Sequence, residues 1–309
     1  MFKPQLFAAL ALSASIFAAA AQDGKPIEWV VGYAAGGGSD AVARATAEAM
    51  AKDLGAATNI AAEYTARAKD YGHVVMTADF ATLAANPALF PRLNYNAERD
   101  LAPVGLLARF PLVLVVGPQV PVKTYKEFVA WAKAQPNGIN YASAGVGSPH
   151  HLAAELLREQ MGVPMTHVAY RGGAPAIADV MGGQVPFMLV DTASGNQFVL
   201  SGKVKAIGVA SARRIATLPD VPTLAEQGLS GFEAYAWQGL SVPVGTPPET
   251  ITRLNKALVA ALNATTVKAR FQALGVEALP GTPAQMAAYS KSERERWGRL
   301  LRDNAIKVD

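Results

Sequence analysis

The stretch "VVGYAAGGGSDAVARATAEAM", residues 30–50, places three consecutive glycines between an apolar run and a helical pattern. Residues 26–32 predict a first strand, and apolar residues at helical spacing predict a helix over 39–54. Ser39 is a suitable N-cap, and Asp40 suits a first helical turn. Glycines let a backbone approach a ligand closely, and a helix N-terminus favours anions. The stretch therefore predicts either an anion site or a tight turn that binds nothing.

Two later stretches repeat this arrangement of strand, glycine-rich turn and helix. They are "INYASAGVGSPHHLAAELL" at 139–157 and "THVAYRGGAPAIADVM" at 166–181, and a further strand ends at Asp191. In the first of them, Ser148 is the predicted N-cap and Pro149 occupies the favoured first helical position. Such alternation predicts an α/β fold with mainly parallel sheets, in which ligands lie beyond the carboxyl ends of strands. The turns are therefore expected to face one cleft.

The end of the chain has a different pattern. From residue 247 onward, apolar residues recur at helical spacing, with Leu254, Leu258 and Leu262 on one face. A last helix places Met286 and Trp297 in the same way. Helices without strands between them need a sheet elsewhere in the chain to pack on. We therefore expect a discontinuous first domain that includes these C-terminal helices.

Residues 1–21 combine a positive start, a short apolar run and a final run of alanines. This pattern predicts a cleaved secretory signal peptide and a periplasmic protein. The chain contains no cysteine, which excludes disulfides, thiolate metal sites and a lipoprotein anchor. Its net charge of +4 is not gathered into a basic block, so nucleic acid is not an expected partner.

Known catalytic and cofactor motifs are missing from the sequence. There is no P-loop and no G-x-S-x-G, and "GVGSPH" lacks the third glycine of a dinucleotide fingerprint. His150 and His151 are adjacent, so on a helix they point about 100° apart, which is poor geometry for one metal ion. We therefore expect no metal and no cofactor. Ser148, His150 and Asp191 could form a hydrolytic triad, which leaves a serine hydrolase as an alternative.

Four side chains near the turns have both a binding and a structural interpretation. Arg171 could pair with a carboxylate or remain a solvated surface arginine. Tyr170 could donate a hydrogen bond to a ligand or simply pack. Asp191 could accept from a ligand or cap the helix that starts near Ala193. Trp237 could line a cleft or pack in the core.

Taken in order, the motifs "GYAAGGGSD", "NPALFPRLNYN", "LAPVGLLARFPLVLVV", "INYASAGVGSPHHLAAELL" and "HVAYRGGAPAIADVMGGQV" resemble those of the tripartite tricarboxylate transporter solute receptors, also called Bug-type receptors. The resemblance covers nearly all of the chain after residue 21. It implies a periplasmic, type II-like Venus flytrap of two α/β lobes. Lobe one would comprise 22–115 and 239–309 and lobe two 116–238, with hinge strands near 113–117 and 238–242.

In such receptors, backbone amides and small hydroxyls of both lobes hold a carboxylate. Carried over to this sequence, the candidate residues are Tyr33, Ala34, Gly36, Gly37 and Ser39 in lobe one, and Ser143, Ala144, Gly145, Gly147, Ser148, His150, Tyr170, Arg171 and Asp191 in lobe two. One departure is that the chain passes from Gly55 to Asn59 through only three residues, 56–58, so a strand and an "ENRPGAGG"-like loop of lobe one are expected to be missing.

The resemblance implies a non-enzymatic, monomeric receptor for a small carboxylate: a di- or tricarboxylate, an acidic amino acid or an aromatic acid. It would deliver this ligand to membrane subunits of the tripartite tricarboxylate type. Two alternatives stay open at this point. One is a periplasmic serine hydrolase that uses Ser148 and His150, and the other is a sensing subunit for a membrane kinase.

Overall fold

The computed structural model describes residues 28–31, 38–39, 41–46, 62–69, 71 and 73–307. Several sequence-based expectations lie outside these residues. They are the signal peptide at 1–21, the shortened segment after Gly55, and the candidate site residues Tyr33, Ala34, Gly36 and Gly37.

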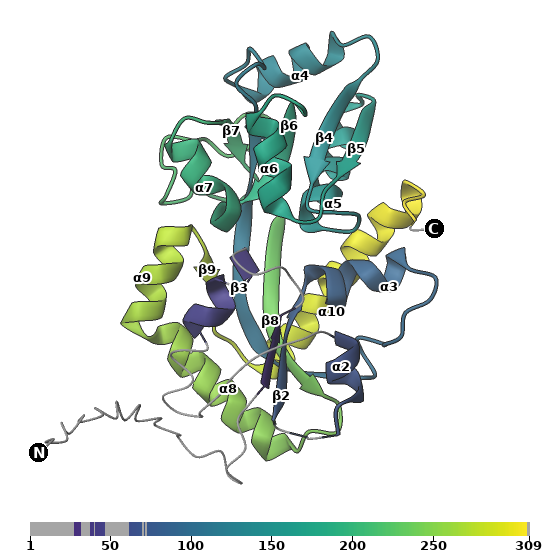
Figure 1. Cartoon of the computed structure of the whole chain (residues 1–309), viewed down its shortest axis with the longest axis vertical. Coiled ribbons are helices and arrows are strands. Elements are labelled where there is room, and N and C mark those ends of the chain that lie inside the picture. Colours follow the sequence, from purple (N-terminus) through teal and green to yellow (C-terminus); the bar gives the residue numbers. More distant parts are fainter. Residues whose placement is uncertain are drawn as a thin grey trace, which may run out of the picture.

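The longest strand, β3 (Leu101–Val116), organises the nine-stranded sheet that the described residues form. Its first part pairs with β8 (Tyr235–Pro243), and its last part, from Leu112 on, pairs with β6 (Phe187–Asp191) and β7 (Lys205–Val209). The remaining strands of the lower half are β1 (Glu28–Val31), β2 (Val74–Asp79) and β9 (Glu277–Ala278), and those of the upper half are β4 (Ile139–Ser143) and β5 (Met165–Ala169). Figure 1 shows β3 and β8 running between the two halves.

The α/β class is confirmed, but the sheet is mixed rather than mainly parallel. β1 pairs with β2, and β4 with β5 and β6, in parallel. In contrast, β3 runs antiparallel to β6, β7, β8 and β9, and β2 runs antiparallel to β8. The apolar pattern of a strand reports its burial and not its direction, so sequence periodicity carried no signal for this difference.

The change of partners along β3 lies at Pro111 and Leu112, where the Leu112 N–H donates to the carbonyl oxygen of Ala234 at 3.3 Å. Residues 113–117 therefore belong to the upper half of the sheet, and residues 238–242 to the lower half. The expected hinge positions differ from this crossing by a few residues, because a continuous apolar run does not reveal where a strand changes its neighbours.

Helices cover both halves of the sheet (Figure 1). Those of the upper half are α4 (Tyr125–Lys133), α5 (Pro149–Met161), α6 (Gly173–Met181) and α7 (Thr192–Leu200). Those of the lower half are α2 (Ala62–Arg67), the π-helix η1 (Ala81–Ala85), α3 (Asn86–Leu89), α8 (Pro248–Asn263), α9 (Thr265–Leu274) and α10 (Pro283–Asp303). Both α8 and α10 contact β3, so the end of the chain packs beside the N-terminal strands. No helix in the described part is long and apolar enough to cross a bilayer.

The two faces of β8 carry different neighbours. Leu240 and Val242 share a core with Leu254 and Leu258 of α8, and all four are fully buried. On the opposite face, Trp237 is buried against α10, which confirms its interpretation as a core residue. Burying one such large side chain contributes roughly 1.5–3 kcal/mol, so both faces of the sheet add substantially to stability.

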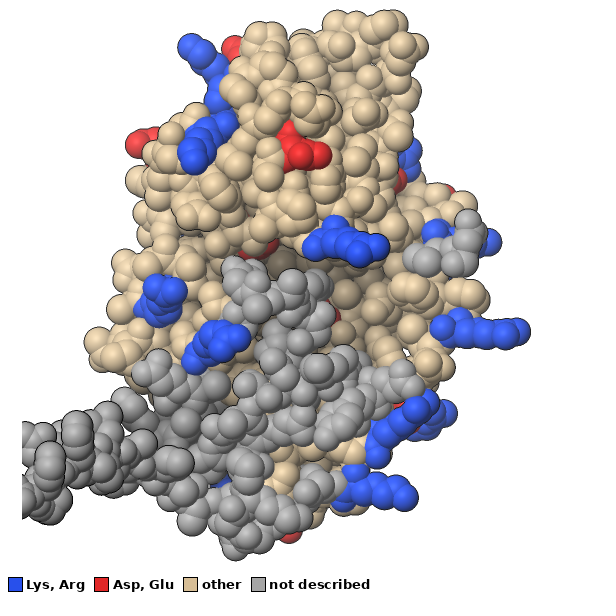
Figure 2. Space-filling view, viewed as in Figure 1, with Lys and Arg blue, Asp and Glu red and all other residues tan. Residues whose placement is uncertain are grey.

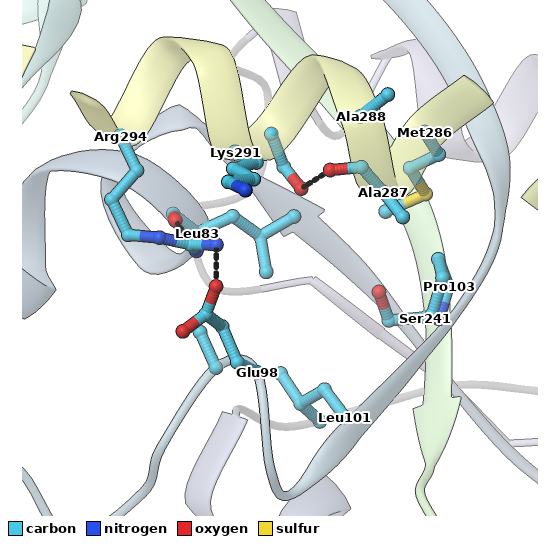
Figure 3. A pocket seen from close by; sticks show the side chains of 12 residues that line it. Leu83, Glu98, Leu101, Pro103, Ser241, Met286, Ala287, Ala288, Lys291 and Arg294 are labelled. Atoms are coloured by element: carbon cyan, nitrogen blue, oxygen red, sulfur yellow. Dashed lines mark hydrogen bonds and ion pairs between the residues drawn. The ribbon is translucent and has the colours of Figure 1, made fainter. Parts of the chain in front are cut away.

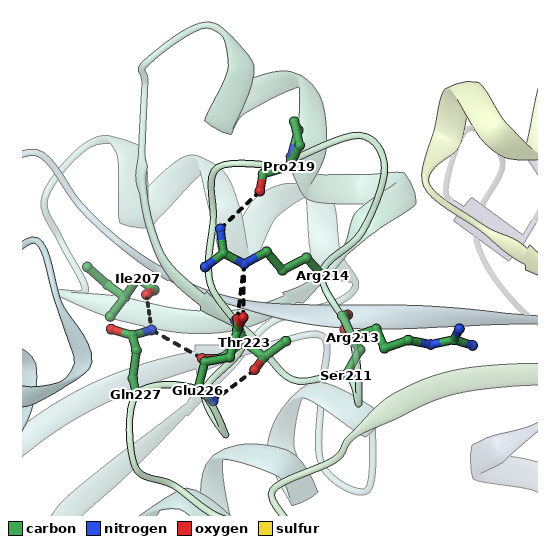
Figure 4. A network of polar contacts seen from close by, with 8 residues as sticks. All are labelled: Ile207, Ser211, Arg213, Arg214, Pro219, Thr223, Glu226 and Gln227. Carbon is green, nitrogen blue, oxygen red and sulfur yellow. Dashed lines mark hydrogen bonds and ion pairs between the residues drawn. The ribbon is translucent and has the colours of Figure 1, made fainter.

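The chain between β7 and β8 is ordered by polar contacts (Figure 4). The Glu226 carboxylate accepts from the Thr223 N–H at 2.6 Å and pairs with Arg214 at 3.1 Å. Arg214 also donates to the carbonyl oxygen of Pro219, and the Gln227 side chain donates to that of Ile207. These bonds satisfy the backbone of a long connection that leads directly to the crossing at Ala234.

Candidate functional site

The turn between β4 and α5, residues 143–148, is built as the sequence predicts. Ser148 is the N-cap of α5, and its Oγ accepts from the His151 N–H at 3.2 Å. Gly145 and Gly147 have φ values of 125° and 75°, a region that side chains disfavour. A Cβ at Gly147 would also lie 2.4 Å from Cδ2 of Leu89 in α3. Glycine is therefore required here by backbone conformation and by the close approach of the lower half.

Much of this turn is hydrogen-bonded to itself. The Gly145 N–H donates to Ser143 Oγ at 3.0 Å, and the Gly147 N–H donates to Nδ1 of His151 at 3.1 Å. The Ser148 N–H donates to the carbonyl oxygen of Gly145. Three other amides, those of Ala144, Val146 and His150, make no hydrogen bond within the described residues. Only this second group offers N–H donors for a ligand.

Two neutral histidines, His151 and His167, contact residues of this turn. His151 and His167 stack with ring centroids 3.9 Å apart, and Tyr141 stacks on His167 at 5.0 Å. Nε2 of His167 lies 2.6 Å from Ser143 Oγ. Burial, followed by repulsion from His167, lowers the pKa of His151 to about 3. Burial also lowers the pKa of His167. Both rings therefore act as hydrogen-bonding groups without charge.

Asp191 connects the helix α5, through His150, with the start of the helix α7. It caps α7, and its Oδ1 accepts from the Ser194 N–H at 2.9 Å. Its Oδ2 lies 3.1 Å from Nε2 of His150. Burial alone would raise the pKa of Asp191, but the bonds to His150 and Ser194 outweigh it and hold that pKa below its usual value. The carboxylate is thus ionised, and both of its oxygens already contact groups of the protein.

Tyr170 and Arg171 have different surroundings. The Tyr170 hydroxyl donates to Oδ2 of Asp179 in α6 at 2.7 Å, which leaves it with a partner inside the upper half. Burial and this bond raise the pKa of Tyr170 to about 12. Arg171 is exposed and makes no ion pair with any described residue. Of the two side chains, Arg171 is the one available to a ligand's charge.

The lower half reaches the upper half at Gly38. A Cβ placed on Gly38 would lie 2.9 Å from Cβ of Ala193 and 3.2 Å from Oδ1 of Asp191. Gly38 and Ser39 are both helical, so Ser39 lies within a helix rather than at the expected N-cap. Its hydroxyl accepts a hydrogen bond from the Gln238 side chain. A helix of the lower half and the start of α7 in the upper half therefore meet here.

Gln238 is a residue that the sequence analysis did not select. It lies on β8, is 3% exposed, and its Oε1 has no hydrogen-bond partner in the described part of the protein. Nδ1 of His150 is buried and unpartnered in the same way. Buried polar atoms almost always have partners, so such atoms call for an explanation by a water or a ligand. The signal in the sequence that could have indicated Gln238 is a large polar residue within a mostly apolar strand.

Two cavities lined by described residues lie elsewhere, in the lower half. One, of about 360 Å³, lies beneath α10 (Figure 3), and the other, of about 380 Å³, lies beside it under residues 87–99. Figure 2 shows a recess between the two halves with basic side chains at its edge. No group of three or more metal-ligating side chains occurs among the described residues.

Two α/β halves that are joined by long strands, with Gly38 of the lower half close to Asp191 and Ala193 of the upper half, have the architecture of a two-lobed solute-binding protein. Residues 34–306 match the family described as "Tripartite tricarboxylate transporter family receptor". Protein BugT of Bordetella pertussis is 30% identical over 314 residues, which cover 98% of this chain and 96% of BugT. The chain therefore belongs to the tripartite tricarboxylate transporter family of receptors.

Solved structures of similar proteins include two that contain organic acids. MatC from Rhodopseudomonas palustris with bound malate is 34% identical, has a TM-score of 0.81, and matches over 89% of this chain and 98% of its own. R. palustris Rpa4515 with adipate is 26% identical, has a TM-score of 0.86, and matches over 92% of this chain and 98% of its own. The resemblance that the sequence motifs indicated is confirmed.

Proposed function

We propose that this protein is a periplasmic receptor that binds a small carboxylate between its two lobes and delivers it to a membrane transporter of the tripartite tricarboxylate type. The predicted signal peptide at 1–21 would direct its export. The lobe bounds proposed from the sequence, 22–115 with 239–309 and 116–238, are part of this proposal. Two relatives whose structures contain malate and adipate support the choice of ligand class.

The observation that carries this proposal is the meeting of Gly38 with Asp191 and Ala193 across the two halves. Around this junction, the unpartnered amides of Ala144, Val146 and His150 supply hydrogen-bond donors. A hydrogen bond from such a donor to a charged acceptor contributes about 1.5–3 kcal/mol net. A carboxylate is thus stabilised mainly by the backbone, with Arg171 as the candidate partner for a second charge.

The ligand would favour the closed arrangement by contacting both lobes at once. The upper turn binds it in the open state, and the helix start at Gly38 and Ser39 adds contacts only on closure. A ligand shifts such an equilibrium by its difference in affinity for the two states. The crossing at Leu112 and Ala234 is the proposed hinge, because β3 changes partners there and β8 begins there.

The alternative of a serine hydrolase lacks the required geometry. The hydroxyl of Ser148 donates to the carbonyl oxygen of Gly145 at 2.7 Å and caps α5. His150 bonds to Asp191, but no hydrogen bond joins the His150 ring to Ser148 in the described structure. A nucleophile needs its base within hydrogen-bond reach, so the binding function is favoured over hydrolysis.

A thermal-unfolding screen tests the proposal. Malate, adipate, an acidic amino acid, an aromatic acid and a tricarboxylate are each added to the protein without its signal peptide. We expect at least one acid to raise the unfolding temperature in a saturable way, since a ligand that binds only the native state stabilises it. Esters of the same acid should have no effect and should not be hydrolysed. Hydrolysis of an ester that Ser148→Ala abolishes would support the alternative.

A further inference from the structure

The cavity beneath α10 is independent of the turns between the lobes. Its volume is about 360 Å³, within the range of roughly 300–1,000 Å³ that is usual for small-ligand sites. None of the site residues described above lines it. Its lining residues are Leu83, Ala97, Glu98, Leu101, Pro103, Ser241, Met286, Ala287, Ala288, Ser290, Lys291 and Arg294.

Small residues on β8 create this space. A Cβ at Gly239 would lie 2.4 Å from Cε of Met286, so only glycine lets the Met286 side chain lie flat against the sheet. Two positions further along the same face, Ser241 adds only a hydroxyl. Met286 and the neighbouring Leu83 and Leu101 give the cavity apolar walls, and methionine adapts easily to the shape of a guest.

Ser241 provides the first sign that the cavity receives a ligand. The residue is 99% buried, with 1% of its surface exposed, and its hydroxyl makes no hydrogen bond in the described part of the protein. Figure 3 shows it among the residues around the cavity, beside Pro103. This hydroxyl lines the cavity, where a polar group of a guest can bond to it in place of water.

Charge at the opposite end provides the second sign. Arg294 is already occupied, because it pairs with Glu98 at 2.5 Å and donates to the carbonyl oxygen of Leu83 at 2.7 Å. Lys291, one turn earlier in α10, lines the same cavity and has no ion pair or hydrogen bond with any described residue. The unbalanced charge at this end of the cavity is therefore positive.

We propose that this cavity is a second binding site, for a small amphipathic carboxylic acid. The carboxylate lies at the Lys291 ammonium, the apolar body lies against Leu83, Leu101 and Met286, and Ser241 bonds to the carboxylate or to a polar group at the far end, according to the length of the acid. The site is separate from the proposed cleft between the lobes, so the protein can hold two acids at once.

Octanoate titrated into the full mature chain tests this proposal, with octan-1-ol as the uncharged probe. We expect octanoate to bind once per chain, and Lys291→Glu to weaken it by roughly two- to fivefold, in line with the value of an exposed ion pair. The matched control is Lys268→Glu on α9, an exposed lysine far from the cavity, which should leave the affinity unchanged. Octan-1-ol should bind more weakly than octanoate to the wild type and equally to all three proteins.

A second variant blocks the space without touching the core. Ala287 is exposed at the rim, so Ala287→Trp should fold normally and reduce octanoate binding at least tenfold, while Ala260→Trp on α8 should not. Ser241→Leu, which fills the cavity from inside, should act like Ala287→Trp. The proposal is overturned if octanoate does not bind the wild type, or if its affinity is the same in Ala287→Trp and in Lys291→Glu as in the wild type.

Discussion

The imidazole rings of His151 and His167 lie parallel, 3.9 Å apart, directly under the glycine turn that begins the proposed binding site. One comes from the first turn of α5 and the other from β5. Nδ1 of His151 accepts from the Gly147 N–H, and Nε2 of His167 lies at the Ser143 hydroxyl. The shape of the turn therefore depends on the His151 ring remaining neutral, because a protonated Nδ1 no longer accepts from the Gly147 N–H.

This arrangement predicts that stability falls in mild acid. The pKa of His151 is lowered from an ordinary value near 6.5 to about 3. Between these values the unfolded chain binds a proton at His151 and the native chain does not, so stability is complete above about pH 6.5 and is lost as the pH falls. For one such histidine the loss between pH 7.5 and pH 5 is about 2 kcal/mol.

Urea unfolding at several pH values, for the wild type and for His151→Gln, measures this effect. Glutamine can still accept from the Gly147 N–H but does not titrate. The variant should therefore lose about 2 kcal/mol less than the wild type between pH 7.5 and pH 5. An identical pH dependence of the two proteins would contradict a neutral, buried His151.

Ser143 is predicted to stabilise the turn from its other side. Its Oγ accepts from the Gly145 N–H at 3.0 Å, and the residue is fully buried. Ser143→Ala leaves that N–H and the His167 ring without this partner, so we expect the free energy of unfolding to fall by about 1–3 kcal/mol. Ser201→Ala is the control, because the Ser201 hydroxyl is exposed and makes only a 3.4 Å bond. Equal losses in the two variants would show that the turn does not depend on Ser143.

Glu293 is predicted to hold α10 on the sheet. Its Oε2 accepts from the indole N–H groups of Trp237 at 3.1 Å and of Trp297 at 2.9 Å. Glu293→Leu would leave both donors buried and unpaired, at a cost of roughly 2–6 kcal/mol. Glu295→Leu changes an exposed neighbour on the same helix and should cost less than about 0.5 kcal/mol. Chemical denaturation followed by tryptophan fluorescence measures both, and a stable Glu293→Leu protein would refute this role.

Local patterns in the sequence predicted most of the upper half. Ser148 and Pro149 marked the start of α5, and Asp191 was one candidate cap for the helix that is α7. These elements are set by capping and by periodicity, which act over a few residues. Residues 101–110 of β3 were missed, because Pro103 and Gly105 are poor strand residues. An irregularity in the pairing with β8 at 103–105 accommodates both of them.

The site was less predictable, because its contacts join residues that are distant in the sequence. The Tyr170 hydroxyl donates to Asp179. The amides of Gly145 and Gly147 donate to side chains of their own turn and of α5. Gln238 meets Ser39 across almost 200 positions of sequence. A motif can indicate that backbone donors are near a helix start, but only the folded chain determines which of them remain unpaired.

The most direct test of the account is a calorimetric titration of the acid identified by the thermal screen into wild type, Gly38→Val and the control Gly182→Ala. A side chain at Gly38 would press on Ala193 and Asp191 of the other lobe, whereas one at Gly182 makes only a contact of 3.4 Å. We expect one acid per chain in the wild type and in Gly182→Ala, and an affinity at least tenfold lower in Gly38→Val. Equal affinities in all three proteins would contradict binding of the acid between the lobes.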